Sequence, residues 1–490
     1  MPRPRRPRGG CSRCGAKAQY LVRDLLFCRP CFTKHIHHRL GRTINGPLAA
    51  SSRPNITARP PPQAGGALLA LSGGAGSTAL LDYLVERRYL GTAETPRVPP
   101  VWPTAYAVHV VFPGADEKAW LRAMVERRGI KYLSVRAEDV FDPSLGRRIA
   151  REAGVAEDEG DDTPVDAADN ADADADAVDT HTADTVTDSD TTTDTADTAN
   201  TARLAALLAS LRPASRPTVH AHILDAVLDT VAASLRVSHL VLGETATREA
   251  QRVVAGTAHG RGFSLPLDLV TLSPGFSVPP PSSVLETLST ASAASGAPVG
   301  EAGGGGAQGH RVSRLRGARE LTVKEAALYC HARGLQTFNF REGSERRSVE
   351  GLTERFVATL STRHPATVGA ITRTAAKLTY TGGDEPPCPL CRRPADPGIR
   401  EWRARASLTF LPVTAAAKAE GMPAKAEEAA DELDPHELDP LLCYACSTTL
   451  RGRKAGPMPP FVVDGVRRRN EARRVSQDEM RAAIADFLLE

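Results

Sequence analysis

Several features that define common protein classes are missing from this 490-residue sequence. No stretch approaches the roughly 18 consecutive apolar residues that indicate a transmembrane helix. Residues Met1–Gly10 are rich in Pro and Arg and contain no apolar core, so no secretory signal is expected there. No repeat of the solenoid type is present. The sequence therefore predicts a cytoplasmic protein of two to four domains, with no membrane partner.

Basic residues are absent from one long segment. Glu152–Asn200 contains 17 acidic residues and no Lys or Arg. Its Asp, Thr and Ala composition cannot bury a core, so we expect a disordered acidic insertion in a surface loop at 152–200. The other residues hold 61 basic and 41 acidic side chains, a net charge of about +20. So basic a fold favours a polyanion as partner, and solubility alone is the alternative explanation.

Nine cysteines are present, and eight of them fall in four Cys-x-x-Cys pairs. Two pairs separated by 13 residues lie near the N-terminus, and two separated by 51 residues lie near the C-terminus. Four thiolates complete a tetrahedral shell that favours zinc, with an iron–sulfur cluster as the alternative. We therefore expect two structural zinc sites in a reducing compartment, with the ligands Cys11, Cys14, Cys28 and Cys31 in one and Cys388, Cys391, Cys443 and Cys446 in the other. The ninth cysteine, Cys330, is expected to be a buried structural thiol.

A glycine-rich turn follows the apolar run Ala67–Leu71 and precedes an amphipathic segment. Strand, glycine turn and helix start form a phosphate-binding loop, because free N–H groups at the helix start point at an anion. No Gly-Lys-Ser/Thr closes this loop, so it is not a Walker loop. It resembles the Ser-Gly-Gly-x-Asp-Ser loop of the ATP pyrophosphatases, with Gly76 in place of the Asp, which makes ATP binding doubtful. The remnant consists of Ser72, Gly73, Gly74, Gly76 and Ser77.

Strand-like and helix-like segments alternate after residue 66, which is typical of parallel βαβ units in an α/β fold. We expect strands at Ala67–Leu71, Tyr106–Phe112, Ile130–Val135 and His239–Gly243. Helices are expected at Phe32–Arg42, Asp116–Arg128, Thr218–Leu235, Thr247–Val254, Thr322–Arg333, Ser348–Leu360, Val368–Leu378 and Asp478–Leu488. The expected domains are a zinc module with a basic helix at 1–45, a linker at 46–66, the α/β domain at 67–385 with a Pro/Gly/Ser-rich loop at 274–310, a second zinc module with a mobile insertion at 386–450, and a basic tail at 451–490.

The order of these motifs resembles the cytoplasmic tRNA 2-thiolation protein 2 family. The resemblance rests on the N-terminal cysteines, the degenerate loop, Leu240–Glu244 with Thr247-Arg248, Gly260-Arg261-Gly262, Leu321–Cys330, and the C-terminal cysteine pairs. It implies a doubly wound parallel sheet of the adenine-nucleotide α-hydrolase, or PP-loop, type. It also implies a place in the complex that thiolates wobble uridine 34 of the tRNAs for Lys, Gln and Glu, with sulfur from a ubiquitin-like carrier.

Two departures from the active members of this superfamily define the expected role. Gly76 replaces a carboxylate, and no Cys-x-x-Cys lies between Asp82 and Leu321, where a catalytic pair would belong. The resemblance therefore implies a non-catalytic subunit, without catalytic residues of its own, that pairs with an active PP-loop homologue and supports tRNA binding. The alternatives are an autonomous ATP-dependent tRNA sulfurtransferase and a zinc-stabilised RNA-binding scaffold.

Clusters of basic residues are the expected contacts with tRNA. The side chains chosen are Lys34, Arg39, Arg42, Arg248, Arg261, Arg467 and Arg468, with the histidines at 35, 37 and 38 as exposed neighbours. Neutralising several phosphates releases counterions, so tRNA affinity should fall steeply with salt.

Overall fold

The computed structural model describes residues 9–49, 59–91, 99–115, 117–155, 190–273, 311–338, 348–364, 366–383, 385–396, 398–399 and 438–483. The predictions for 156–189, for the loop at 274–310 and for most of the insertion within 386–450 therefore lie outside the described residues. Among the helices described, none is long and apolar enough to cross a bilayer.

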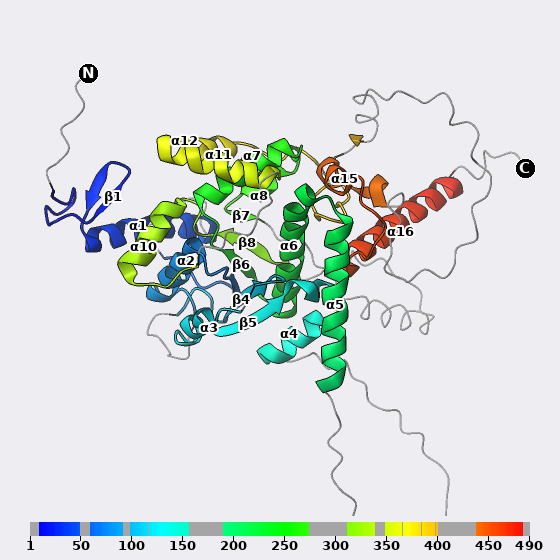
Figure 1. Ribbon diagram of the computed structural model, residues 1–490, viewed down its shortest axis with the longest axis horizontal. Helices are drawn as coiled ribbons and strands as arrows, with labels where there is room; N and C mark the ends of the chain where they lie inside the picture. The colour runs from blue at the N-terminus through cyan, green and yellow to red at the C-terminus, as the bar shows by residue number, and fades with distance from the viewer. Residues whose placement is uncertain are drawn as a thin grey trace, which may run out of the picture.

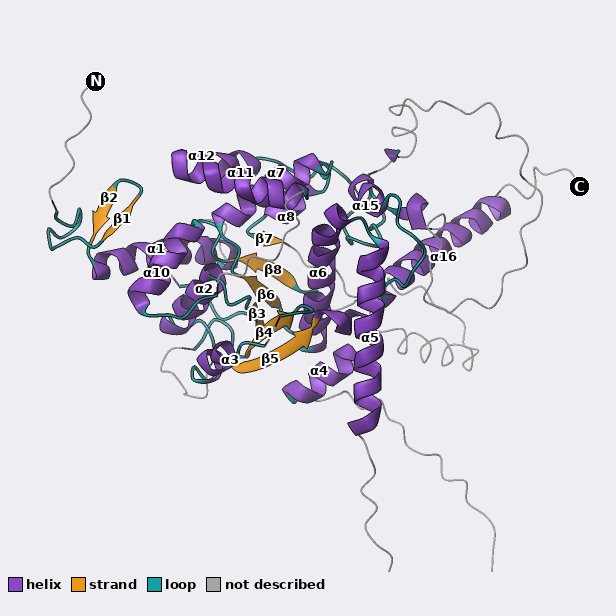
Figure 2. Cartoon of the chain, viewed as in Figure 1, coloured by secondary structure: helices purple, strands orange, loops and turns teal. Residues whose placement is uncertain are grey.

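A six-stranded sheet forms the centre of the molecule (Figure 2). Its strand order is β5-β4-β3-β6-β8-β7, and every neighbouring pair is parallel except β7 with β8. The chain starts in the middle and winds outward in both directions, which is the doubly wound order expected from the resemblance. The strands are β3 (Ala67–Ala70), β4 (Ala105–Val111), β5 (Lys131–Arg136), β6 (His239–Leu242), β7 (Leu272–Ser273) and β8 (Ser313–Arg316).

Side chains alternate between the two faces of the sheet, and each face has its own core. Leu69 and Val241 face the core formed with α1 (Arg29–Leu48), α2 (Ala75–Glu86), α3 (Ala119–Glu126) and α10 (Val323–Arg333). Leu68 and Leu240 face the core formed with α4 (Leu145–Ala153), α5 (Asp190–Ser210) and α6 (Arg216–Ser234). Burial on both faces explains why the central strands are continuous apolar runs in the sequence.

A further group of helices packs at the side of this sandwich. The helix α7 (Ala246–Ala258) contacts α8 (Leu265–Leu269), α11 (Val349–Arg363) and α12 (Ala366–Ala375), and these helices lie together in Figure 1. The remaining helices, α15 (Tyr444–Leu450) and α16 (Pro460–Ala483), follow the second cysteine set. In the part of the chain that the structure describes, short 3₁₀ turns lie at Ala137–Phe141, Pro213–Ser215 and Asp439–Leu441.

The first helix corrects a predicted boundary. We expected a module to end at residue 45 and a linker to begin at 46, but α1 runs through Leu48. Ile36, Ile44 and Leu48 are buried against α2 and α10, so this helix belongs to the core of the α/β domain. The antiparallel hairpin formed by β1 (Tyr20–Val22) and β2 (Leu25–Phe27) projects beyond it (Figure 1).

The acidic insertion is shorter than its composition suggested. The helix α4 extends to Ala153, and α5 begins at Asp190, so both ends of 152–200 are helical. The helix α5 is held in place because Leu204, Leu207 and Leu211 are buried in the core, while Asp197 pairs with Arg136 at 3.0 Å. The final helix also begins at Pro460 rather than at 478.

Strand β8 was missed because its sequence, Ser-Arg-Leu-Arg, has a charged residue at every second position. Arg314 and Arg316 are nevertheless buried, since each has an acidic partner. Arg314 pairs with Asp225 at 3.0 Å and with Asp229, and Arg316 pairs with Glu244 at 3.3 Å. Buried charges of this kind need partners that only the tertiary fold can supply.

Candidate functional site: a closed glycine loop and two four-cysteine clusters

The glycine loop has the backbone form expected of a phosphate cradle, but its polar groups bond to one another. The helix α2 begins at Ala75, and Gly73 has a positive φ of 74°. Ser72 Oγ accepts a hydrogen bond from the Gly74 N–H at 3.3 Å and lies 3.3 Å from Ser77 Oγ. The Ser77 hydroxyl in turn donates to the Gly74 carbonyl at 3.1 Å. Both hydroxyls that could meet a phosphate are therefore engaged within the loop.

The backbone packing around Gly76 leaves no room for a side chain. A Cβ atom at this position would lie well inside van der Waals contact of the Gly243 carbonyl oxygen and 2.8 Å from Thr245 Cγ2. The contact is reciprocal, because a Cβ at Gly243 would lie 2.5 Å from the backbone nitrogen of Ser77. The turn after β6 thus presses directly on the start of α2. The carboxylate missing from the sequence is also excluded by the structure.

A second segment crosses the outside of the loop. The Phe338 N–H donates to the Gly73 carbonyl at 2.7 Å, and the Lys118 ammonium lies 4.2 Å from the centre of the Phe338 ring. The indole of Trp120 packs within 3.4 Å of the Cβ position of Gly73. These contacts cover the cradle from the solvent side.

Cys330 lies beside the start of α2, with its thiol 3.5 Å from the Ala75 carbonyl. The side chain is 1% exposed, and burial raises the pKa of this thiol to about 12. A thiol in this state is not nucleophilic at neutral pH. The prediction of a buried structural thiol at Cys330 is confirmed.

The N-terminal cluster brings together Cys11, Cys14, Cys28 and Cys31. Their four Sγ atoms all lie within 4.8 Å of one another, with Cys14 and Cys28 at 3.5 Å. The Cys11 carbonyl accepts from the Gly15 N–H, and the Cys28 carbonyl accepts from the Phe32 N–H. These turns aim both thiols of each pair at one point, so the cluster can hold a metal ion.

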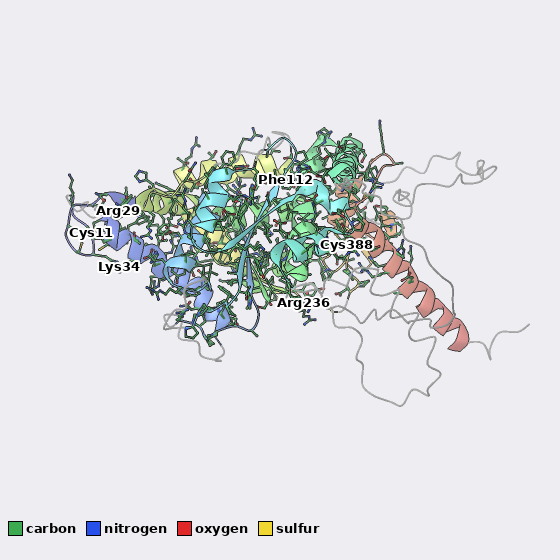
Figure 3. All side chains as sticks on the ribbon, turned by 90° about the horizontal axis from the view of Figure 1, so that it is seen from below. Cys11, Arg29, Lys34, Phe112, Arg236 and Cys388 are labelled. Carbon is green, nitrogen blue, oxygen red and sulfur yellow. The ribbon has the colours of Figure 1, made fainter. Side chains whose placement is uncertain are left out.

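The C-terminal cluster brings together Cys388, Cys391, Cys443 and Cys446, whose Sγ atoms also lie within 4.8 Å of one another. Unlike the N-terminal cluster, it is built into the α/β domain. Cys388, Cys443 and Cys446 are buried in the same core as α5 and α6. Figure 3 shows Cys11 and Cys388 far apart along the molecule. The pairing across 51 residues, which the sequence left uncertain, is therefore seen in the structure.

Arg261 lies at this second cluster and not at a free surface. Its guanidinium lies 2.8 Å from His222 Nε2, which is 4.0 Å from Cys446 Sγ. Burial lowers the pKa of Arg261, but the negative charges of Cys446 and Cys391 outweigh burial, so the pKa of Arg261 is raised. Its place in the fold indicates a structural role beside the cluster, which weakens its prediction as a tRNA contact.

Two of the basic side chains chosen on α1 are engaged inside the chain. Arg39 pairs with Glu325 at 2.7 Å, and Arg42 pairs with Glu320 at 2.9 Å, whereas Lys34 is exposed. Two of the neighbouring histidines are also partly buried. His37 Nε2 lies 2.8 Å from the Tyr329 hydroxyl, and the ring of His35 stacks on the ring of Phe27 with 5.0 Å between the ring centres. Burial lowers the pKa of both histidines, so they are neutral at pH 7 and add no charge for a phosphate.

The other chosen cations differ in exposure. Arg248 is half exposed and pairs with Glu354 at 3.6 Å, while Arg467 is exposed and lies 3.7 Å from Asp464. Arg468 is exposed on α16. Sequence reasoning missed three exposed cations within or between the N-terminal cysteine pairs, namely Arg13, Lys17 and Arg29. Figure 3 shows Arg29 and Lys34 beside Cys11 at one end of the molecule. The available signal was the place of Arg13 and Arg29 inside the two Cys-x-x-Cys pairs.

The carboxylate of Glu325 fixes α1 and the hairpin to α10. It accepts from Arg39 and from Arg23, the latter at 2.8 Å, and closes a capping box with Thr322. Burial raises its pKa, but Arg39, the Thr322 amide and Arg23 outweigh burial, so the pKa of Glu325 is lowered from 4.5.

This clamp gives a pH-dependent prediction. Since the pKa of Glu325 is lower in the folded state, its stabilisation is present above pH 4.5 and disappears as the pH falls through the folded pKa. Glu325→Gln should therefore cost about 1.5–3 kcal/mol at pH 7. The difference from wild type should shrink on acidification, which urea unfolding between pH 7 and pH 3 would measure. A cost that does not vary with pH would contradict this account.

Comparison with known proteins adds three findings. Residues 348–448 match the family model described as cytoplasmic tRNA 2-thiolation protein 2. The chain is 21% identical over 445 residues to the curated Schizosaccharomyces pombe protein of that name, covering 91% of this chain and 93% of the relative. Among solved structures, it is similar to the U34-tRNA thiolase NcsA from Methanococcus maripaludis with its 4Fe–4S cluster, with a TM-score of 0.43 and 14% identity over 77% of this chain and 89% of that one.

Proposed function

We propose that this chain is the non-catalytic subunit of the cytosolic complex that thiolates uridine 34 of the tRNAs for Lys, Gln and Glu. The proposal is supported by the match of residues 348–448 to the cytoplasmic tRNA 2-thiolation protein 2 family model and by the similarity to the Schizosaccharomyces pombe protein of that name over 91% of the chain. The chain pairs with an active PP-loop homologue, which takes sulfur from a ubiquitin-like carrier. The observation that carries this proposal is the contact between Gly76 and Gly243. It closes the position at which a PP-loop enzyme would place its carboxylate.

The chemistry that adenylates and thiolates a base needs three things that this chain lacks or has blocked. A carboxylate to organise Mg²⁺ has no room at position 76. The hydroxyls of Ser72 and Ser77 bond to each other and to Gly74. The one cysteine near the loop, Cys330, is buried with a raised pKa. These features favour a supporting subunit over an autonomous enzyme.

Each cysteine cluster holds one zinc ion in this proposal. Zinc bound to sulfur at about 2.3 Å in a tetrahedron places the sulfur atoms about 3.8 Å apart. The four Sγ atoms of each cluster lie within 4.8 Å of one another. The Sγ atoms of Cys14 and Cys28 are 3.5 Å apart in the N-terminal cluster, and those of Cys391 and Cys443 are 3.8 Å apart in the C-terminal cluster. This spacing supports the choice of a single ion in each cluster over a cluster of several irons. When bound, zinc supplies crosslinking and no redox chemistry.

In this proposal, the chain's own residues hold elements of the fold in position and support tRNA binding. The C-terminal cluster fixes residues 385–396 and α15 against α5 and α6. The segment of the N-terminal cluster carries the exposed cations Arg13, Lys17 and Arg29, and Arg29 and Lys34 lie at this end of the molecule (Figure 3). Exposed cations arranged in this way hold a phosphate backbone without reading its sequence.

The proposed function is tested by reconstitution. The purified chain alone should leave tRNA unthiolated in the presence of ATP and a sulfur donor. Addition of the active homologue should produce 2-thiouridine, detected by retardation of the tRNA in a mercury-containing gel. Thiolation by the isolated chain would show that it is the autonomous enzyme instead.

The tRNA contact gives a separate prediction. Arg29→Ala/Lys34→Ala should lower the slope of log affinity against log salt by about 2, because each lost phosphate contact lowers it by about 1. The matched variant Arg147→Ala/Arg151→Ala removes two exposed cations from α4 and should leave the slope unchanged. Filter binding from 50 to 300 mM KCl would measure both. Equal effects of the two variants would count against a contact at the N-terminal cluster.

A further inference from the structure

The helix α11 carries two large apolar side chains that are more than half exposed. Among its 15 residues, the one large apolar side chain that is fully buried is Val357. Leu352 and Phe356, by contrast, are 54% and 55% exposed. With the partly buried Leu360, they form a row at spacings i, i+4 and i+8 along one side of the helix. An apolar row of this kind on a surface helix is a mark of a binding face.

The helix is nevertheless fixed rigidly in place. Its N-cap, Ser348, is buried and accepts from the Gly351 N–H at 3.0 Å. Glu350, in the first turn, accepts from Thr218 of α6 and lies 2.9 Å from His259 Nε2 at the end of α7. The row of Leu352 and Phe356 is therefore presented by a helix that is already ordered, which lowers the entropic cost of binding a partner.

The charges around the row argue for an acidic partner. Residues 348–377 contain four Lys or Arg and two acidic residues. Both acidic residues are paired inside the chain, Glu350 with His259 and Glu354 with Arg248. A second copy of the chain would bring the same basic surface against itself, and like charges across an interface are strongly unfavourable.

The same residues do not suit RNA. Of the three side chains in the row, only Phe356 has an aromatic face on which a base could stack, and the two leucines have none. Two cations near the row are also hydrogen-bonded within the chain, since Arg248 contacts Glu354 and Gln251, and Arg355 Nε donates to the Gly351 carbonyl at 3.3 Å. A protein with an apolar groove and an acidic rim fits the surface better.

We propose that Leu352, Phe356 and Leu360 of α11 form the surface that binds the active PP-loop homologue, against an apolar groove with an acidic rim. This inference rests on the proposed function, because it assigns the site at which the two subunits of that complex meet. The helix lies within the segment that matches the family model.

The test measures association of the purified chain with the purified homologue, by light scattering and by titration calorimetry. Leu352→Asp/Phe356→Asp should weaken the complex by at least about 30-fold, the size typical of hot-spot residues. Leu352→Ala/Phe356→Ala adds no charge to the helix and should weaken it in the same direction. The control, Leu21→Asp/Leu25→Asp, changes two leucines of similar exposure on the distant hairpin and should bind like wild type.

Circular dichroism and thermal unfolding would establish that each variant is folded. Wild-type affinity in both α11 variants would overturn the inference and leave the proposed function intact. Loss of tRNA binding by the isolated α11 variants would overturn it in favour of an RNA contact, and loss of self-association in favour of a second copy. A wild-type chain that fails to bind the homologue at all would instead refute the proposed function itself.

Discussion

Replacing Cys446 with serine should destabilise the whole α/β domain, whereas replacing Cys14 with serine should leave that domain folded. Cys446 is fully buried in the core that contains Leu204, Leu207 and Ile223 of α5 and α6. Structural zinc contributes about 10–16 kcal/mol in small peptides, so the loss of one ligand should cost at least about 4 kcal/mol here. On the proposed assignment of one zinc ion to each cluster, the zinc content should fall from two ions to one in either variant.

The difference between these two variants arises from where each cluster sits. Cys14 is exposed. The helix α1 stays packed on the α/β domain through Phe32, Ile36 and Leu40 even when the N-terminal cluster holds no metal. Only the hairpin should then lose its order. Urea unfolding followed by the fluorescence of Trp102, which is buried on the opposite face of the sheet, would report on the α/β domain. Equal midpoints for Cys446→Ser and wild type would contradict this prediction.

Restoring the missing carboxylate should not restore ATP binding. In Gly76→Asp, the new side chain must displace the backbone of Gly243 or of α2, because neither neighbour is the end of a flexible side chain. Overpacking costs about 1–3 kcal/mol where side chains can adjust, so we expect about 3 kcal/mol or more here. Calorimetric titration with ATP and Mg²⁺ should show no binding, and urea unfolding should show the loss of stability.

A matched control separates steric exclusion from the added charge. Gly262 has no atom within 4 Å of its Cβ position, and Gly262→Asp should therefore change stability by no more than about 0.5 kcal/mol. If Gly76→Asp were as stable as this control and bound ATP at micromolar concentration, the loop would be inactive for lack of one residue. The close packing of Gly243 on α2 would then not be the reason that the loop fails to bind ATP.

The elements that the sequence predicted well are those with a strong local pattern. The apolar runs of β3, β4, β5 and β6 were placed within about two residues, because strands buried on both faces leave a continuous apolar signal. The helix α10 begins at a capping box formed by Thr322 and Glu325, and it ends at Gly334 with a positive φ of 68°. These signals lie within a few residues of the boundaries that they mark.

The elements that were missed or misplaced depend on distant partners. Strand β8 is charged along its length and is stabilised by Asp225 and Asp229 of α6. The start of α5 looks disordered by composition, yet Leu204 and Leu207 fix the helix against the sheet. Composition averages over a segment and so cannot show which of its residues will meet a core.

The sequence by itself determined the two cysteine clusters, the doubly wound α/β fold, the loss of the loop carboxylate and the resemblance to a known family. Each of these features is indicated by residue types at short spacings or by the order of motifs along the chain. Only the tertiary structure decided that Arg39 and Arg261 turn inward, that Gly76 has no space for a side chain, and that α11 leaves Leu352 and Phe356 exposed. The physical reason is separation along the chain. Arg39 pairs with Glu325, which is 286 residues away in the sequence, and Gly76 contacts Gly243 in the turn after β6. No local sequence pattern can therefore predict either contact.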